Sequence, residues 1–233
     1  MSATGGMPTT RSWLPARLGL GLLLVAAVAW SAHFLFGVFD RYRHVDPATY
    51  TFFWDRRAWL WTHLAGGGLT LVLGPLQFLT QWPRAHARLH RWSGRLYLIG
   101  MLIACTGATG LIATSPAPFG IRLAFAATAW AWLLTALAGL VAIRRGQVRR
   151  HRTWMTRSYL VTLAPVIFRV FLHLPGIFSV LPPPPEGIAW LLWLSWLLPL
   201  VVHAAVRQAW QVFARWRGSL AGPVTDRGAG APG

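Results

Sequence analysis

Three histidines in this sequence occupy similar positions in three long apolar stretches, an arrangement that fits the binding of haem between helices. His63 lies four residues inside its stretch, His173 lies seven residues inside another, and His33 is placed similarly in a third. At about 1.5 Å per residue, His63 and His173 lie about 6 and 10 Å from one end of a helix. A bis-imidazole haem needs two such histidines on facing helices. The pattern predicts His63 and His173 as ligands of a haem b iron.

Three consecutive glycines follow His63 by one helical turn, at positions 66–68. Glycine removes the side chains that would keep a flat macrocycle away from the helix. Glycines in membrane helices also permit close helix packing, and a histidine near the membrane interface also bonds a backbone carbonyl or water. The sequence leaves both interpretations of His63 open, haem ligand and structural residue.

Arg169 lies in the middle of an apolar stretch, one helical turn before His173 and about 16 Å from the predicted outer end. A charge at that depth costs at least a few kcal/mol, so it normally faces the bundle interior and is paired. The apolar stretches contain no Asp or Glu. The predicted partner of Arg169 is therefore a carbonyl, an outer-loop acid such as Asp55 or Asp40, or an anionic ligand. A haem propionate, a lipid phosphate and a quinone oxygen each fit that last role.

A basic segment occurs twice in the chain, each time on a predicted loop that leads into an apolar stretch. The two copies are His90-Arg91-Trp92-Ser93-Gly94-Arg95-Leu96-Tyr97 and His151-Arg152-Thr153-Trp154-Met155-Thr156-Arg157-Ser158-Tyr159. One functional interpretation is a second haem or metal site at His90 and His151. Another is an anion cradle made by these histidines with Arg91, Arg95, Arg152 and Arg157. The structural alternative is that the arginines set the topology and bind anionic lipid headgroups, while the tyrosines anchor the interface.

The composition indicates an integral membrane protein. The chain has 233 residues, of which 55% are hydrophobic and only 12% charged, about half the charged share of a soluble domain. Its formal net charge is +17, but the arginines cluster between the apolar stretches, as in a membrane protein. No soluble nucleic-acid-binding domain remains once these stretches are set aside, so nucleic-acid binding is not predicted. The single cysteine, Cys105, excludes an internal disulfide, a CxxCH haem attachment and a Cys-rich metal site.

Six stretches are long enough to cross a bilayer as helices, which takes about 20 apolar residues each. They are 18–39, 59–81, 96–115, 121–143, 158–180 and 188–210. Continuous apolar runs favour helices over a barrel. The predicted fold class is an all-α polytopic membrane bundle of six transmembrane helices, with a duplicated four-helix core formed by helices 2–3 and 4–5.

The distribution of arginines predicts the orientation. Of the 22 basic residues, 16 fall on one side of the predicted bundle and five on the other, which also holds four of the five acids. The positive-inside rule makes the first side cytoplasmic, together with both termini. The expected location is the plasma (inner) membrane of a bacterium, with multiple passes. The predicted organisation is a disordered N-terminus at 1–15, a transmembrane domain at 16–217 and a disordered tail at 218–233.

Four motifs together resemble an uncharacterised bacterial membrane family, the domain of unknown function 2306. They are His63-Leu64-Ala65-Gly66-Gly67, Leu73-Gly74-Pro75-Leu76-Gln77-Phe78 and the two copies of the basic segment. The resemblance covers about Trp59 to His173 and implies a polytopic membrane protein with no assigned activity. A looser similarity, by analogy only, is to four-helix b-type cytochromes.

Two classes of function follow from these residues. The first is a b-type haem-binding protein in electron transfer or haem handling, with Arg169 pairing a propionate. The second is a non-redox transporter or a lipid- or anion-binding scaffold that uses Arg169 and the cytoplasmic arginines, with the lipid bilayer and anionic headgroups as partners. The sequence has no P-loop, no G-x-S-x-G elbow and no HExxH motif. It leaves open whether the protein is an enzyme, and it names no redox partner or oligomeric state.

Overall fold

The computed structural model describes residues 14–80 and 86–220, and in these ranges the chain is helical with no strand. The elements are α1 (Leu14–Tyr42), α2 (Pro47–Tyr50), the 3-10 helix η2 (Thr51–Arg56), α3 (Arg57–Thr80), α4 (Ala87–Ala113), α5 (Phe119–Arg144), α6 (Val148–Thr162), α7 (Ala164–Leu172), α8 (Ile177–Val180) and α9 (Glu186–Leu220). The predicted disordered ends fall mostly on 1–13 and 221–233, which lie outside the described residues.

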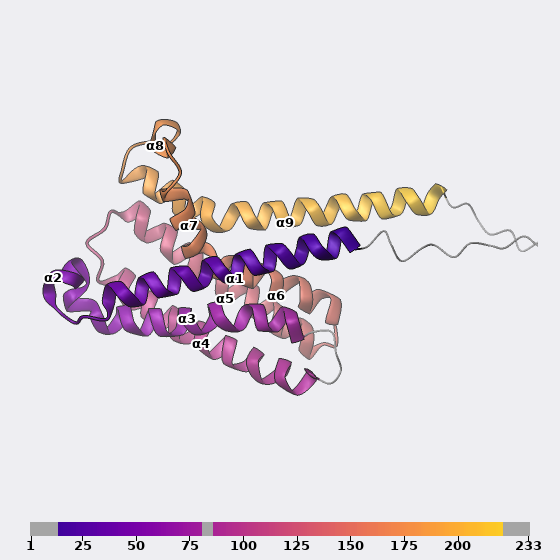
Figure 1. Cartoon of the computed structure of the whole chain (residues 1–233), viewed down its shortest axis with the longest axis horizontal. Helices are drawn as coiled ribbons and strands as arrows, with labels where there is room; N and C mark the ends of the chain where they lie inside the picture. The colour runs from indigo at the N-terminus through magenta and orange to yellow at the C-terminus, as the bar shows by residue number, and fades with distance from the viewer. Residues whose placement is uncertain (1–13, 81–85, 221–233) are drawn as a thin grey trace, which may run out of the picture.

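Four helices form the centre of the molecule. Helix α3 packs along α4, and α5 packs along α6, so that each pair is a helical hairpin. The two hairpins meet through α4 with α5 and through α3 with α6. Helix α9 covers α5, α6 and α7, whereas α1 packs on α3 and α7 (Figure 1). The core between the hairpins contains Met101, Ala104, Trp132, Val161 and Trp196.

The α3–α4 hairpin is close because small residues line its contact. A Cβ added at Gly66 would overlap the backbone of Gly100 and Ala104 in α4. Small residues let membrane helices approach until their backbones touch. The structure therefore gives Gly66 a packing role, which is the structural alternative left open by the sequence.

Three of the described helices, α4, α5 and α9, are long and apolar enough to cross a membrane, and the bent pair α6–α7 makes a fourth if it is a single span. The chain is therefore an all-helical membrane protein with three to four candidate spans, not clearly the six expected. Helix α3 has 24 residues, about 36 Å, but His63, Gln77 and several glycines and threonines lower its hydropathy. Six spans remain a prediction.

The fifth predicted span, 158–180, was wrong as a single helix. The chain bends by 42° between α6 and α7, because Pro165 lies in the first turn of α7 and has no N–H to continue the α6 ladder. The helix then ends at Leu172, with His173 as its C-cap residue. His173 therefore lies at a helix end and not seven residues inside one.

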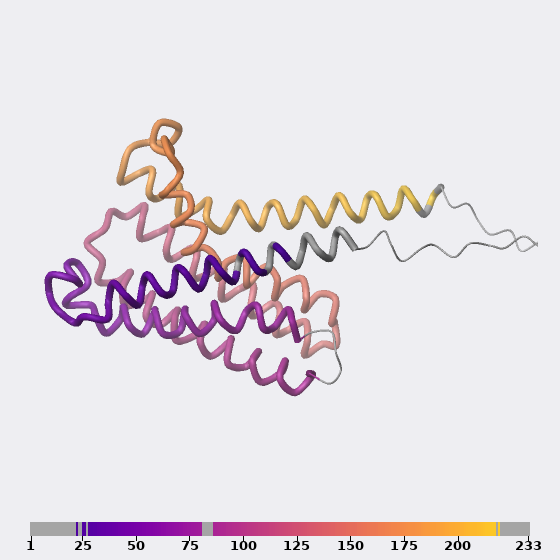
Figure 2. Tube along the Cα trace, viewed as in Figure 1, coloured from indigo at the N-terminus to yellow at the C-terminus, as the bar shows by residue number. Residues whose placement is uncertain are grey.

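The basic segments are also helical rather than loops. Helix α4 begins at Ala87 and α6 at Val148, so His90 and His151 each lie in the first turn of a helix. Pro75 does not end α3, which runs on to Thr80. The beginning of α1 and the end of α9 lie at the same end of the molecule (Figure 1), and the coloured part of the α9 trace in Figure 2 runs toward that end. Helix α9, with 35 residues and about 52 Å long, extends well past the hairpins at that end.

Candidate functional site

A cavity of about 430 Å³ lies between α6 and α9, and we call it the α6–α9 cleft. Its polar lining consists of Thr153, Arg157, Arg207, Gln208, Gln211 and Arg215. Positions 153 and 157 are one turn apart on α6. Positions 207, 211 and 215 recur every four residues on α9, with 208 next to 207. Such spacing places the residues of each helix on one face. Two polar helix faces are therefore turned toward each other.

Arginine side chains from both helices converge on the α6–α9 cleft. Arg207 donates a hydrogen bond to the Thr153 hydroxyl across the cleft, and the Arg157 guanidinium lies 4.6 Å from the centre of the Trp154 ring. Arg215 completes a set of three guanidinium groups, and none of the described residues that line the cleft carries a carboxylate. Like charges repel at such range, so the cleft has a net positive potential that an anion would neutralise.

His203 adds a polar atom beside the α6–α9 cleft. It lies one helical turn before Arg207 and within electrostatic reach of Arg157 and Arg207. Its Nδ1 atom is buried and has no hydrogen-bond partner among the described residues. An unpaired buried polar atom costs roughly 1–3 kcal/mol of stability. A bound molecule that reached this ring nitrogen would supply the missing hydrogen bond.

The two copies of the basic segment differ in what covers them. Each holds an arginine over a tryptophan three residues earlier, with Arg95 at 4.9 Å from the Trp92 ring and Arg157 at 4.6 Å from the Trp154 ring. Helix α9 packs on α6, which carries the second copy, and α4 is not among its close neighbours. Arg95 is exposed. The second copy therefore contributes Thr153 and Arg157 to the α6–α9 cleft.

The structure brings His90 and His151 close enough to interact electrostatically, with Arg152 and Arg91 also within reach of His90. The ring nitrogen Nδ1 of His151 lies 2.9 Å from the Gly139 carbonyl oxygen. That of His90 lies 3.3 Å from the Thr80 hydroxyl. In each histidine, one ring nitrogen therefore contacts the helix that precedes it in the same hairpin.

The motif residues at the end of α3 make contacts within their own hairpin and with α6. Gly74 leaves room for the ring of Tyr159, since a Cβ at position 74 would overlap it. Phe78 packs edge-on against the same ring at 5.5 Å between centroids. Gln77 donates to the carbonyl oxygen of His90 at 3.2 Å and also bonds the Ser93 hydroxyl. These contacts give the motif a structural role.

The two predicted haem ligands lie on different parts of the molecule. His63 is half-buried, and its Nδ1 is 3.0 Å from the Ala104 carbonyl oxygen in α4. His173 is exposed, and its Nδ1 is 2.7 Å from the carbonyl oxygen of Arg169 in its own helix. Helix α7 packs mainly on α9, and also on α1 and α6, whereas α3 packs mainly on α4. The structure does not place the helices of His63 and His173 as a closely packed pair.

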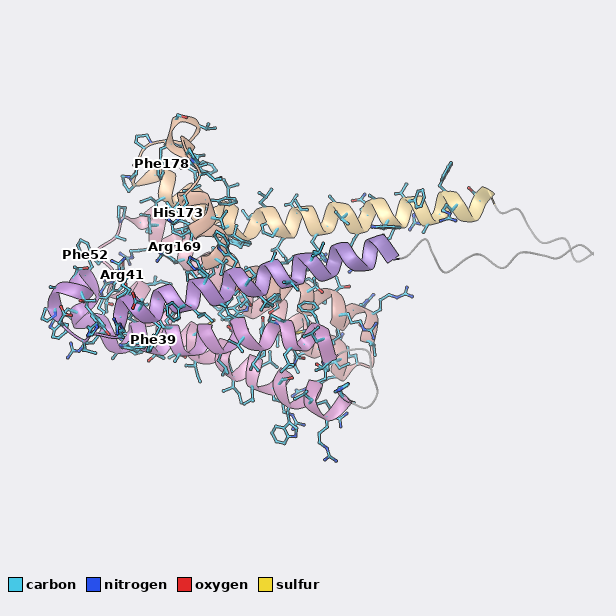
Figure 3. All side chains as sticks on the ribbon, in the orientation of Figure 1. Phe39, Arg41, Phe52, Arg169, His173 and Phe178 are labelled. Atoms are coloured by element: carbon cyan, nitrogen blue, oxygen red, sulfur yellow. The ribbon has the colours of Figure 1, made fainter. Side chains whose placement is uncertain are left out.

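Arg169 meets an aromatic ring rather than an acid. Its guanidinium carbon lies 5.8 Å from the centre of the Phe34 ring in α1, a cation–π distance. Figure 3 shows Arg169 and His173 together on α7. Among the described residues, no group of three or more His, Cys, Asp or Glu side chains is placed to hold a metal ion.

A family model described as predicted membrane protein (DUF2306) matches residues 60–206. The chain belongs to this family. The DUF2306 match begins in α3 and ends in α9, so it extends beyond His173 and includes His203, Thr153 and Arg157. The α9 side chains that complete the cleft, from Arg207 to Arg215, follow the matched segment. No curated protein and no solved structure matches the chain.

Sequence reasoning missed the α6–α9 cleft as a site. It grouped Arg157 with the arginines of the repeated segment and did not connect Arg207 or Arg215 with them. A signal was present, because Arg207, Gln208, Gln211 and Arg215 follow helical spacing and form a polar stripe on an otherwise apolar helix. No sequence pattern gave the pairing of α9 with α6.

Proposed function

We propose that this DUF2306 protein binds a phosphate-type anion, either free or as part of a larger molecule, in the α6–α9 cleft. The observation that carries the proposal is the convergence of Arg157, Arg207 and Arg215 on one cavity, with no carboxylate among the described residues that line it. Guanidinium groups match the oxygens of phosphate in pairs. Thr153, Gln208 and Gln211 supply further polar groups around the cleft.

A phosphate fits the cleft better than a carboxylate does. Three positive charges from two helices exceed what a single carboxylate neutralises, whereas a phosphate monoester carries up to two negative charges and three terminal oxygens. His203 lies beside the same arginines with a free ring nitrogen. The expected role is anion recognition at a membrane surface, as a binding or transport protein rather than a redox protein.

The proposal includes an orientation. The end of the molecule that carries the cleft also carries most of the arginines, so we place this end and both termini in the cytoplasm of a bacterium, with the chain in the inner membrane. The cleft then faces cytoplasmic phosphate compounds and the headgroups of the inner leaflet.

Thermal unfolding of the detergent-purified protein tests the proposal, with its 15 tryptophans as the fluorescence signal. Inorganic phosphate is expected to raise the Tm above that in chloride at equal ionic strength, because a ligand that binds only the folded state stabilises it. R157Q and R207Q should each lose most of the rise. R95Q is the matched control, since Arg95 has the same Trp contact outside the cleft. An equal loss in R95Q would contradict the proposal.

Haem binding is the second candidate. The observation in its favour is that His63 uses Nδ1 on the Ala104 carbonyl, which leaves Nε2 as the nitrogen for a metal, as in many metal-ligating histidines. His173, Arg169, His90 and His151 stay predicted cofactor contacts under this candidate. A visible spectrum of the reduced protein after expression with ample haem tests it. Sharp α and β bands that disappear in H63A would support haem, and a colourless protein would exclude it.

A further inference from the structure

The α6–α9 cleft continues sideways into an apolar hollow on α9. The hollow is a shallow, open depression on one face of α9, where the described lining residues are Ala205, Gln208, Ala209, Val212, Phe213 and Trp216. Gln208 and Val212 line both the cleft and the hollow. A molecule held by the arginines is therefore also in contact with an apolar surface.

The apolar surface extends from the hollow toward the middle of α9. Leu198 and Val202 precede Ala205 and Ala209 at spacings of four, three and four residues, so all four lie on one stripe of the helix. Leu198 is 46% exposed and Val202 51% exposed. The α9 stripe, Leu198, Val202, Ala205, Ala209 and Val212, is a continuous apolar track that begins beside the arginines.

The length of α9 sets the depth of the cleft in the bilayer. A hydrocarbon layer of about 30 Å takes about 20 helical residues, which leads from Glu186 at the start of α9 to about position 206. At about 1.5 Å per residue, Arg207 then lies at the edge of the hydrocarbon and Arg215 about 13 Å beyond it, so the cleft begins in the headgroup layer and opens toward water, while Leu198 to Ala205 lie in hydrocarbon. Trp210, about 6 Å beyond the hydrocarbon, is 58% exposed, as expected of an interfacial aromatic residue.

We infer that the anion in the α6–α9 cleft is the headgroup phosphate of an acidic phospholipid, whose acyl chain follows the α9 stripe. The inference rests on the proposed function and narrows it to one source of phosphate. The cationic cleft complements the headgroup, the hollow accommodates the glycerol region, and the stripe leads into the membrane at the depth of an acyl chain. A soluble phosphate compound has no part that would use the hollow or the stripe.

The experiment compares three probes by thermal unfolding in detergent. They are a short-chain phosphatidic acid, glycerol 3-phosphate, which has the phosphate without acyl chains, and phosphatidylcholine of the same chain length, which has the chains without net charge. Phosphatidic acid is expected to reach half-saturation at a concentration at least tenfold below that of glycerol 3-phosphate. Phosphatidylcholine should give no saturable shift.

Two substitutions on exposed alanines of α9 separate the hollow from the cleft. A209W fills the hollow and should raise the half-saturating concentration of phosphatidic acid at least tenfold. The Tm shift produced by glycerol 3-phosphate should stay the same. A214W is the matched control, because Ala214 is also exposed but lines neither cavity, and it should change neither response. A209L replaces A209W if the tryptophan variant does not fold. R207Q should abolish the response to both phosphate probes.

The outcomes distinguish this inference from the proposed function. Equal affinity for phosphatidic acid and glycerol 3-phosphate, with loss of both in R207Q, overturns the lipid inference and leaves anion binding standing. No response to either probe overturns both. Equal saturable responses to phosphatidic acid and phosphatidylcholine, unaffected by A209W, indicate ordinary lipid solvation and overturn the inference. If A209W instead converts a dimer into a monomer without affecting the lipid response, the hollow binds a second copy and the inference is wrong.

Discussion

The hydroxyl of Tyr97 lies 3.0 Å from the hydroxyl of Ser158, so the first copy of the basic segment, on α4, contacts the second copy, on α6, directly. This buried contact joins the α3–α4 hairpin to the α5–α6 hairpin. Tyr97 also contacts the Thr162 hydroxyl at 2.7 Å and accepts from Trp132 Nε1 at 3.2 Å.

Y97F is expected to destabilise the protein by about 1–3 kcal/mol, because it leaves three buried polar partners, on Trp132, Ser158 and Thr162, without the shared hydroxyl. Y159F is the matched control. The Tyr159 hydroxyl is buried beside the Ser31 hydroxyl and makes no hydrogen bond of good geometry among the described residues, so its removal should cost less than removal of the Tyr97 hydroxyl. The free energy of unfolding in mixed micelles checks both. A larger loss in Y159F than in Y97F would show that the Tyr97 network is not what joins the hairpins.

G74A is expected to lower the Tm and cost about 1–3 kcal/mol, since the added methyl overlaps the buried ring of Tyr159 and overpacking of a core is costly. G67A in the same helix has nothing within 4 Å of the new Cβ. It should stabilise α3 by up to about 1 kcal/mol, because alanine loses less backbone entropy than glycine. Thermal unfolding of the two variants in parallel tests this, and a loss of similar size in G67A would contradict it.

The membrane character, the family and the all-helical fold could be predicted from the sequence because they depend on composition and on local runs of residues. The resemblance to DUF2306 was recognisable from motifs such as Leu73–Phe78. The structure shows that residues of this motif contact Tyr159 and His90. The span boundaries were less predictable. A proline such as Pro165 either bends a helix or ends it, and only the surrounding packing decides which.

The candidate site was harder to predict than the fold. The position of Arg169 in an apolar stretch predicted an acidic or anionic partner, yet its guanidinium lies over the Phe34 ring. No local sequence pattern indicates an aromatic partner from α1. Arg157 and Arg207 are 50 residues apart in sequence and share a cavity only because α9 returns along α6. Residues that come together only through the tertiary fold have no characteristic spacing in the sequence.

Asp46 at the start of α2 gives a pH-dependent contribution to stability. The Thr49 hydroxyl donates to its carboxylate at 2.6 Å and the Thr49 backbone N–H donates at 2.8 Å, and these bonds lower the pKa of Asp46 below its usual 3.8. A carboxyl with a lowered folded-state pKa stabilises the protein above about pH 4 and loses that contribution as pH falls through the folded-state value. The Tm difference between the wild type and D46A should therefore shrink below pH 4. A difference that stays constant down to pH 2 would contradict this role.

Single-cysteine labelling in whole cells tests the orientation. Cys105 is buried, so C105A gives a background without thiols, and one cysteine is then placed at either end of the molecule. S219C, near the end of α9, should react with a membrane-impermeant maleimide only after the cells are opened. S179C in α8 should react in intact cells, because it lies at the opposite end. The reverse pattern would place the α6–α9 cleft outside the cell.

H203L tests whether the free ring nitrogen of His203 serves the α6–α9 cleft. In the absence of anions the variant should be as stable as the wild type or slightly more stable, because it removes a buried polar atom that has no partner among the described residues and that costs roughly 1–3 kcal/mol when unpaired. In saturating phosphate it should gain less stability than the wild type, by about 1 kcal/mol, if the nitrogen bonds the anion. Unfolding of the variant and the wild type, each with and without phosphate, measures the stability of the free protein and the stabilisation by phosphate. A loss of stability without phosphate, together with an unchanged phosphate response, would assign His203 to packing alone and restrict the anion site to the three arginines.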